Sequence, residues 1–296
     1  MLFGPTAVGK TAMTIALFSN HYEIVNSDSV QVYKHLDIAS AKPDKFTLSL
    51  IRHHLIDILE PTEQFTVGTY CNMAEPLLDE IEARGNVALL TGGTAYYFRQ
   101  FLYGVASTPE ADPAVRERVR AEIEQKGRTW AYEYLKIIDP LSAERINAND
   151  IYRISRAIEV YMQSGKPLSS FKVNTEVRAS LDPLIIGLHL DKTVLDKRIE
   201  QRVDQMFSSG LMDEIDRLKK MGASPSWPAM QAIGYKEFFI PGLTLSEIRD
   251  RIIVSTRQYA KRQMTFFRSF RNVNWFSPDD YDGVRKLVRD SGFPMD

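Results

Sequence analysis

The sequence contains a single cysteine, Cys71, among its 296 residues. One cysteine can form neither an internal disulfide nor a thiolate zinc cluster, so we expect a packing residue in a reducing, cytoplasmic protein. The chain also lacks any run approaching the ~18 apolar residues of a membrane span, and any signal-peptide pattern. We therefore expect no membrane association. The formal net charge of −1 excludes a globally basic nucleic-acid binder, although it allows a local basic patch.

The composition is that of an ordinary globular protein, 44% hydrophobic and 25% charged, with length for one large or two modest domains. β-branched runs that end in small or polar residues alternate with helical patterns. These runs lie at 23–28, 87–93 and 183–191. The alternation predicts an α/β fold with a parallel sheet flanked by helices. Two long helical patterns, 192–220 and 245–270, follow the last run, and Thr244 and Glu247 have capping-box spacing before the second.

The pattern changes between residues 109 and 178, where no convincing strand is found. Helical stretches run from 113 to 126 and from 151 to 164, and Gly165 and Pro167 end the second. We therefore predict an all-helical domain at 109–178, inserted into an α/β core formed by 1–108 and 179–296.

Near its start the chain reads GPTAVGKT, which matches the phosphate-binding P-loop pattern G-x-x-x-x-G-K-[ST]. The glycines let the backbone bend round phosphate oxygens, and amide N–H groups at a helix N-terminus favour negative charge. Lys10 adds a cation, and the Thr11 hydroxyl is placed to ligate Mg²⁺. A chance match in a glycine-containing turn is the alternative. Only residues 1–3 precede the loop, short for the strand that it should leave, so the sequence is expected to begin late. The residues of the predicted diphosphate site are Gly4, Pro5, Thr6, Ala7, Val8, Gly9, Lys10 and Thr11.

Two further strand ends carry polar clusters, at 26–29 (NSDS) and 91–94 (TGGT). Ligands in open α/β sheets lie beyond the carboxyl ends of the strands, so both clusters are expected near the P-loop. The Asp28 carboxylate would then be a Mg²⁺ partner or a proton acceptor, whereas an Asx-turn or helix cap is the alternative. Arg198 and Arg202, one helical turn apart, suit a second grip on phosphate or, equally, a solvated face with neighbouring acids.

The stretch 249–271 contains seven Lys or Arg and one acid. Arg257, Lys261 and Arg268 share a helical face, and aromatic rings are interleaved with them. This composition fits an RNA backbone track with stacking rings, and packing of the rings into the core is the commoner alternative. The rings are Tyr259, Phe266, Phe267 and Phe270. We interpret His53 and His54 as structural.

In chain order these motifs resemble those of the tRNA dimethylallyltransferase family, the bacterial enzymes that prenylate the adenosine next to the anticodon. The resemblance rests on GPTAVGKT, NSDSVQVYKHLDIASAKP (26–43), HHLIDILEP (53–61), TGGTAYYFRQFLYG (91–104), INANDIYRISRAIEVYMQSGKPLS (146–169), AMQAIGYKE (229–237) and TRQYAKRQMTFFR (256–268). Ala39 and Ser40 depart from the family's usual Gly-Thr. The zinc-finger tail of some eukaryotic relatives is absent.

The resemblance implies transfer of a dimethylallyl group from dimethylallyl diphosphate to N6 of that adenosine, with release of diphosphate. It gives the P-loop the prenyl diphosphate rather than ATP. Asp28 resembles the general base, Thr94 resembles a residue beside the reacting atoms, and Lys10, Thr11 and Arg202 resemble the groups that hold diphosphate and Mg²⁺. A monomer acting on the tRNA anticodon stem-loop is implied. The positions that resemble tRNA contacts are Asp28, Ser29, Val30, Gln31, Thr94, Arg116, Tyr152, Arg153, Arg156, Gln231, Gly234, Lys236, Lys261, Arg262 and Arg268.

Three alternatives remain at this point. A P-loop kinase or NTPase usually holds Mg²⁺ with an aspartate after an apolar strand, and here the strand VALLT runs into Gly92 and Gly93 instead. A prenyl transferase acting on free AMP or ATP would share the donor site. A tRNA-binding protein with a vestigial loop would be inactive.

Overall fold

The computed structural model describes residues 1–104, 107–171 and 174–295. The chain divides into two compact units. The first comprises Met1–Phe101 and Ala179–Asp296, and the second comprises Leu102–Arg178. The division falls within helix α4 (Ala95–Tyr103), so the second unit begins earlier than the predicted residue 109.

The first unit contains a six-stranded sheet in the order β3-β2-β4-β1-β5-β6, and every neighbouring pair is parallel. This confirms the predicted α/β class. The strands are β1 (Leu2–Phe3), β2 (Tyr22–Asn26), β3 (His53–His54), β4 (Val87–Gly92), β5 (Ile186–Leu188) and β6 (Asn274–Phe276). The sequence did not indicate β3 or β6, because two or three residues are too few for a recognisable alternation.

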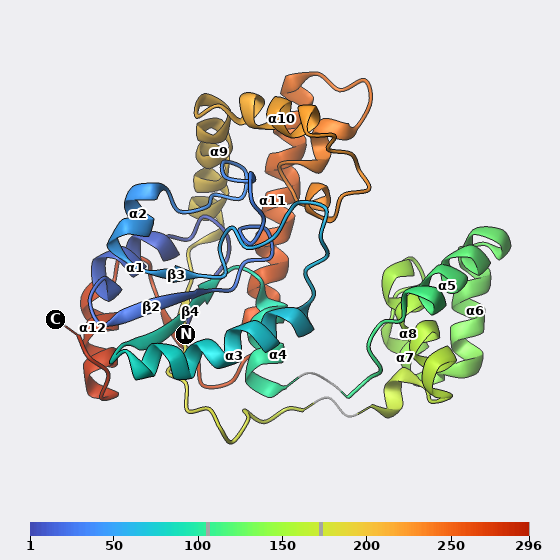
Figure 1. Cartoon of the computed structure of the whole chain (residues 1–296), viewed down its shortest axis with the longest axis horizontal. Coiled ribbons are helices and arrows are strands. Elements are labelled where there is room, and N and C mark those ends of the chain that lie inside the picture. Colours follow the sequence, from blue (N-terminus) through green and yellow to red (C-terminus); the bar gives the residue numbers. More distant parts are fainter. Residues whose placement is uncertain (105–106, 172–173, 296) are drawn as a thin grey trace. The chain divides into compact units, whose positions relative to one another are not determined.

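Helices flank this sheet on both faces (Figure 1). The predicted helix at 192–220 is two helices, because the chain turns at Ser209 and Gly210. The capping box of α11 is confirmed, since Glu247 accepts a hydrogen bond from the Thr244 amide at 2.8 Å. The helices are α1 (Lys10–Phe18), α2 (Lys45–Leu50), α3 (Val67–Ala83), α4, α9 (Lys192–Ser208), α10 (Leu211–Lys220), α11 (Leu245–Phe267) and α12 (Tyr281–Asp290), with the 3-10 turns η2 (Pro228–Gln231) and η3 (Lys236–Phe239).

Successive side chains of β1 point to opposite faces of the sheet and so join two different layers. Leu2 packs in a core with Met13 of α1 and Val284 of α12. Phe3 stacks on Phe267 of α11, with ring centroids 4.3 Å apart, and contacts Phe98 of α4 edge-on. The central strand β1 is therefore packed on one face by α1 and α12 and on the other by α4 and α11, and this fixes the start of the loop that follows it.

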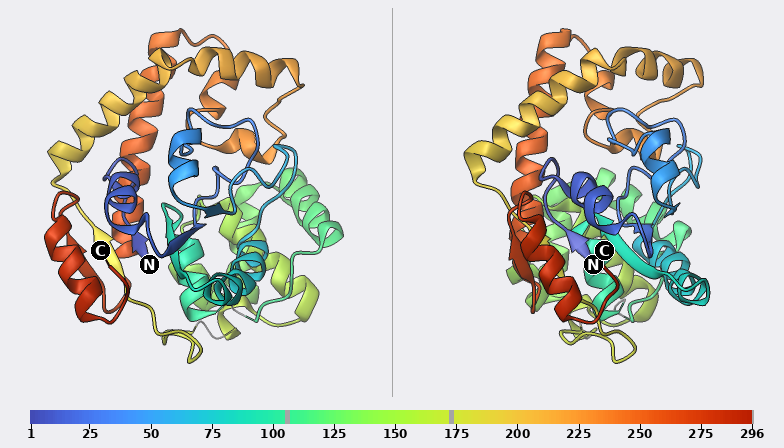
Figure 2. Two further views of the ribbon diagram at one scale, coloured as in Figure 1. Left: turned by 60° about the vertical axis from the view of Figure 1, so that its left-hand side comes forward. Right: turned by 90° about the vertical axis from the view of Figure 1, so that its left-hand side faces the viewer.

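Helix α9 packs against α11 (Figure 2). Leu195 and Ile199 of α9 cluster with Ala260 of α11. These side chains recur at helical spacing, so the remaining faces of both helices are free to carry polar groups.

The second unit is helical throughout its described residues, which contain no strand. Its elements are α5 (Pro113–Lys126), α6 (Arg128–Ile138), α7 (Pro140–Arg145), α8 (Ile151–Ser164) and the 3-10 turn η1 (Leu168–Ser170). Helices α5 and α8 have the predicted bounds, because Asp112 and Asp150 cap their first turns. None of the helices in the described part of the chain combines the length and apolar character that crossing a membrane requires.

Candidate active site

The P-loop follows the central strand β1, and its last two residues, Lys10 and Thr11, are the first two residues of α1. Gly9, which precedes the helix, has φ 116°, a conformation that residues with a side chain rarely adopt. The Lys10 ammonium folds back over the loop and donates to the carbonyl oxygens of Gly4 at 2.9 Å and Pro5 at 3.0 Å. The loop is thus bent around the Lys10 ammonium group.

Two arginines of α9 reach the same loop. Arg202 Nη1 donates to the Thr6 hydroxyl at 2.9 Å, and Arg198 Nη1 donates to the Val8 carbonyl at 3.1 Å. The neighbouring acids on α9 are engaged by α11, since Glu200 accepts from Arg257 at 2.9 Å and Asp204 accepts from Arg249 at 2.6 Å. The structure contradicts the solvated salt-bridged face, because both arginines bond to the P-loop and the acids bond to α11. The second grip on phosphate stays a prediction.

Two cations, Lys10 and Arg202, lie together in this cradle and are partly removed from water. Desolvation lowers the pKa of Lys10 to about 8, while the Asp28 carboxylate opposes that shift and Arg202 adds to it. Burial also lowers the pKa of the Arg202 guanidinium, and Asp28 again acts in the opposite direction. Two buried cations facing one carboxylate leave a net positive site, which is suited to a diphosphate.

Asp28 follows β2 and uses one oxygen to shape its own loop. Its Oδ1 accepts from the amides of Val30 at 2.9 Å and Gln31 at 3.4 Å. The Asx-type cap proposed as the alternative therefore forms, and the same carboxylate still lines the cavity. Capping orients the group because it restricts the side-chain rotamer.

The turn after β4 is joined to the Asp28 loop. The Thr94 hydroxyl accepts from the Ser29 amide at 2.9 Å and donates to the Ser29 hydroxyl at 3.2 Å. The Thr94 amide donates to the Ser27 carbonyl at 3.0 Å. The ends of β2 and β4 thus form one continuous polar rim, as expected from their position at the carboxyl edge of the sheet.

These elements enclose a cavity of about 510 Å³. Gly4, Pro5 and Thr94 are not among the residues that line it. Gly4 and Pro5 accept hydrogen bonds from the lining residue Lys10, and Thr94 accepts one from the lining residue Ser29. His53, interpreted from sequence as structural, also lines the cavity. The predicted residues that line it are Thr6, Ala7, Val8, Gly9, Lys10, Thr11, Asp28, Ser29, Val30, Gln31, Arg202, Gln231 and Gly234.

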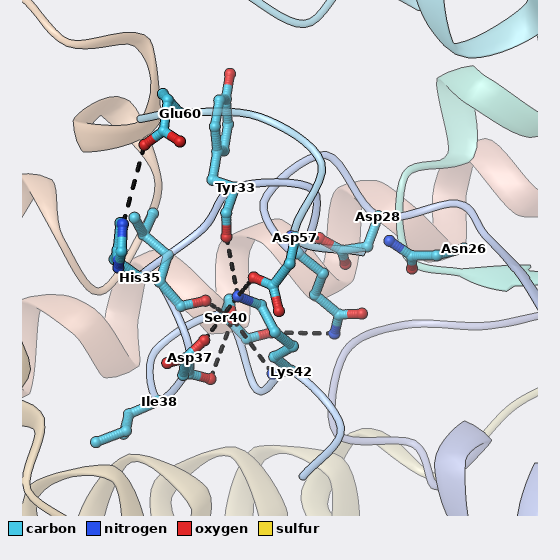
Figure 3. Close-up of polar contacts among 12 residues, drawn as sticks. Asn26, Asp28, Tyr33, His35, Asp37, Ile38, Ser40, Lys42, Asp57 and Glu60 are labelled. Carbon is cyan, nitrogen blue, oxygen red and sulfur yellow. Dashed lines mark hydrogen bonds and ion pairs between the residues drawn. The ribbon is translucent and has the colours of Figure 1, made fainter. Parts of the chain in front are cut away.

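The loop carrying Ala39 and Ser40 is held by a buried lysine (Figure 3). Lys42 Nζ donates to the Tyr33 carbonyl at 2.9 Å, to Asp37 at 2.6 Å and to Asp57 at 2.5 Å, and its side chain is only 3% exposed. Lys42 therefore satisfies its three N–H groups within the protein and is a structural cation.

Other contacts join this loop to the cavity. The side-chain Nε2 of Gln31 donates to the carbonyls of Ser40 at 3.2 Å and Ala41 at 3.1 Å. Buried Glu214 of α10 accepts from the backbone amides of Asp37 at 3.0 Å and Ile38 at 2.9 Å. The Ser40 hydroxyl donates to the Leu36 carbonyl at 2.6 Å, so this departure from the family pattern keeps a hydroxyl that stabilises the loop.

The basic face predicted on α11 is only partly present. Lys261, Arg262 and Arg268 are exposed, whereas Arg257 is engaged by α9 as described above. Lys236 is also exposed. The stacking role suggested for Phe267 and Phe270 is wrong, because both rings are buried against Phe3 in the core.

Two of the four predicted tRNA-contact positions in the helical unit share one acid. Buried Glu159 lies 3.6 Å from Arg116 Nε and 3.4 Å from Arg156 Nη1. Arg153 pairs with Asp150 at 3.3 Å, and Tyr152 is 78% exposed. Their tRNA contacts stay a prediction.

Sequence reasoning missed Gln263, which lines the cavity from α11. The signal was available: Ala260, Gln263 and Phe267 recur at i, i+3 and i+7 on the buried face of α11. A polar residue on an apolar stripe requires hydrogen-bond partners inside the protein.

Comparison with known proteins places this geometry in context. The sequence model of a family described as IPP transferase matches residues 31–270. A tRNA dimethylallyltransferase of Borreliella afzelii is 40% identical over 294 residues, covering 97% of this chain and 97% of the relative.

Two solved structures have similar folds. The full-length tRNA isopentenylpyrophosphate transferase of Bacillus halodurans has a TM-score of 0.70 and 34% identity, covering 98% of this chain and 94% of that chain. A eukaryotic dimethylallyltransferase acting on tRNA has a TM-score of 0.80 and 25% identity, covering 99% of this chain and 79% of that chain.

Proposed function

The chain belongs to the IPP transferase family, and from this premise we propose that it transfers a dimethylallyl group from dimethylallyl diphosphate to tRNA. The acceptor is the exocyclic N6 of the adenosine next to the anticodon, and diphosphate is released. The observation that carries the proposal is that the cations Lys10 and Arg202 and the carboxylate Asp28 line one cavity. A charge-binding cradle and a proton acceptor are what this reaction needs together.

Asp28 acts as the general base. The adenine N6 lone pair is conjugated with the ring, so the amine is a poor nucleophile until a base accepts its proton. As N6 forms a bond to the allylic carbon, the carbon–oxygen bond to diphosphate breaks and the N6 proton passes to Asp28. General-base catalysis of this kind contributes about 10²–10⁴ in rate.

The P-loop stabilises the leaving group. Diphosphate gains negative charge as the carbon–oxygen bond breaks, and loop amides, Lys10 and Arg202 oppose that charge. Arg202 is already held by the Thr6 hydroxyl, so the cation is placed before the reaction begins. Preorganised groups of this type usually supply the largest part of catalysis.

Mg²⁺ fits the donor set of the cavity. Within the described residues, no group of three or more His, Cys, Asp or Glu could hold a metal ion, so the substrate must supply ligands. Mg²⁺ commonly takes one or two protein oxygens together with phosphate oxygens and water. The Thr11 hydroxyl, which lines the cavity at the start of α1, would hold it, and the bound ion would neutralise diphosphate charge.

The acceptor side requires a flipped base. A stacked adenine cannot reach a carbon inside the cavity, and unstacking costs a few kcal/mol that tRNA contacts must offset. We assign those contacts to the exposed basic residues of α11 and to the helical unit. The anticodon stem-loop as partner, a monomeric state and a cytoplasmic location belong to the same proposal.

Mass spectrometry of nucleosides from tRNA provides the test. Unmodified tRNA is incubated with dimethylallyl diphosphate and Mg²⁺, and we expect dimethylallyl adenosine at the position next to the anticodon. A parallel reaction with AMP should give no product, and the protein alone should not hydrolyse ATP. Product only with AMP, or ATP turnover without product, would replace this proposal by one of the alternatives.

The variant Asp28→Asn tests whether Asp28 is the general base. We expect kcat to fall by about 10²–10⁴, with donor affinity changed by less than about threefold. The control Asp216→Asn removes an exposed carboxylate from α10 and should leave both constants unchanged. Full activity of Asp28→Asn would contradict the assignment.

A further inference from the structure

Gln263 is a buried amide on the apolar face of α11. It is 3% exposed, and its neighbours on that face, Ala260 and Phe267, are 2% and 0% exposed. Burying an amide costs free energy unless its donors and acceptor are satisfied, so the contacts of this side chain must repay that cost.

Both ends of the amide bond to backbone groups of the active site. Oε1 accepts from the Thr6 amide of the P-loop at 2.9 Å, and Nε2 donates to the Gly93 carbonyl after β4 at 2.6 Å. Thr6 N–H can only donate and the Gly93 carbonyl can only accept, so the two contacts fix the orientation of the amide.

Gly93 is shaped to receive this side chain. A Cβ atom on Gly93 would lie 2.7 Å from Gln263 Nε2 and 3.5 Å from Asp28 Oδ2. The second glycine of the TGGT motif therefore leaves room for the amide. Gly93 is followed by Thr94, whose hydroxyl accepts from the Ser29 amide. Gln263 is therefore connected through Gly93 and Thr94 to the loop that carries Asp28.

We propose that Gln263 is a positioning residue that sets the distance between the diphosphate cradle and the Asp28 loop. The inference rests on the proposed prenyl transfer and adds a residue to it. The resemblance assigned the nearby Lys261, Arg262 and Arg268 to tRNA contact. Gln263 differs from them, because it is buried and its side-chain amide is engaged on both sides. It acts on the reaction through the two loops and does not touch the RNA.

The first test is Gln263→Leu, which removes both hydrogen bonds and keeps the approximate volume. Misplacing reacting groups by a fraction of an ångström is costly, so we expect kcat to fall about 10–100-fold while KM for the prenyl donor changes less than about threefold. The control Gln258→Leu alters an exposed glutamine of the same helix and should behave like the wild type. Wild-type kcat in Gln263→Leu would overturn the inference.

The second test, Gln263→Glu, uses pH as a switch. A protonated carboxyl group reproduces the amide pattern, because its carbonyl accepts from Thr6 and its O–H donates to Gly93, whereas a carboxylate repels the Gly93 carbonyl. We therefore expect the ratio of variant to wild-type kcat to rise at least about fivefold as the pH falls from about 8 to about 6, since burial raises the pKa of the introduced group. The ratio for Gln263→Leu should stay flat.

Dividing the variant kcat by the wild-type kcat at each pH removes the pH dependence that both proteins share through the titratable groups lining the same cavity. These are Lys10, Asp28, His53, Arg202 and Tyr259. A flat ratio for Gln263→Glu would overturn the inference even if Gln263→Leu failed to fold. Failure of the proposed function is separately visible, because the wild type would then form no product in the same assay.

Discussion

The charge of Lys10 gives the sharpest prediction for the donor site. Burial lowers the pKa of its ammonium group from 10.5 to about 8 in the free protein. If the prenyl diphosphate binds the charged form, raising the pH through this value removes the cation from the cradle. Diphosphate in turn stabilises the ammonium, so binding takes up a proton above the free pKa.

The magnitude follows from that pKa. The dissociation constant should rise about fivefold between about pH 8 and about pH 9, approaching tenfold for each further unit, or about 1.4 kcal/mol. Burial raises the pKa values of Tyr97 and Tyr259 beyond this window, so neither hydroxyl contributes to the slope. Arginine stays charged throughout.

Isothermal titration calorimetry with dimethylallyl diphosphate and Mg²⁺, without tRNA, measures this binding free of turnover. Lys10→Arg keeps its charge over the range, and Lys10→Met never has one, so both should give a flat pH profile whatever their absolute affinity. A flat profile for the wild type, or an equal slope in Lys10→Arg, would refute the reasoning.

The contribution of Lys10 to protein stability should change with pH in the direction opposite to donor affinity, which falls as the pH rises. Since the folded pKa of Lys10 lies below the unfolded value, the unfolded chain binds more protons between about pH 8 and about pH 10.5. The contribution of Lys10 to the unfolding free energy should therefore increase across that window. Thermal melts of wild type and Lys10→Met, compared at each pH, isolate it.

Three further changes test the loop that Lys42 holds and the role of Mg²⁺. Lys42→Met removes the ammonium that joins Asp37, Asp57 and the Tyr33 carbonyl, and should lower the unfolding free energy by about 1–3 kcal/mol, seen as a drop in Tm of about 2–10 °C. Lys45→Met, at an exposed position, is its control, and equal Tm values for the two variants would argue against the structural role. Removing Mg²⁺ with EDTA should abolish product formation, and Thr11→Val should raise the Mg²⁺ concentration needed for half-maximal rate about tenfold or more. Undiminished activity in EDTA would exclude the metal from the reaction.

Much of the local structure could be predicted because its determinants lie close together in the chain. The caps at Asp112 and Asp150 mark the starts of α5 and α8, and the glycines and Lys10 of the P-loop define a turn from a few neighbouring residues. The order of the strands could not be read in this way, since pairing depends on contacts between distant segments.

Helical spacing placed Arg198 and Arg202 on one face of a helix but could not tell what that face meets. The packing of α9 on α11 decides it, because it turns Glu200 and Asp204 toward α11 and leaves both arginines directed at the P-loop. Periodicity likewise marked Phe267 as apolar, without showing that its partner is Phe3 at the other end of the chain.

By itself, then, the sequence determined the P-loop motif, the parallel α/β class and the helical stretch, because each depends on residues adjacent in the chain or at regular spacing. The choice of Asp28 as the general base came from the family resemblance, since the residues alone left a Mg²⁺ partner and an Asx-turn open. Only the tertiary structure decided that Gln263 joins two loops and that Lys42 is buried among acids. Both depend on groups from different loops that meet only in the folded chain, and no local pattern records such distances.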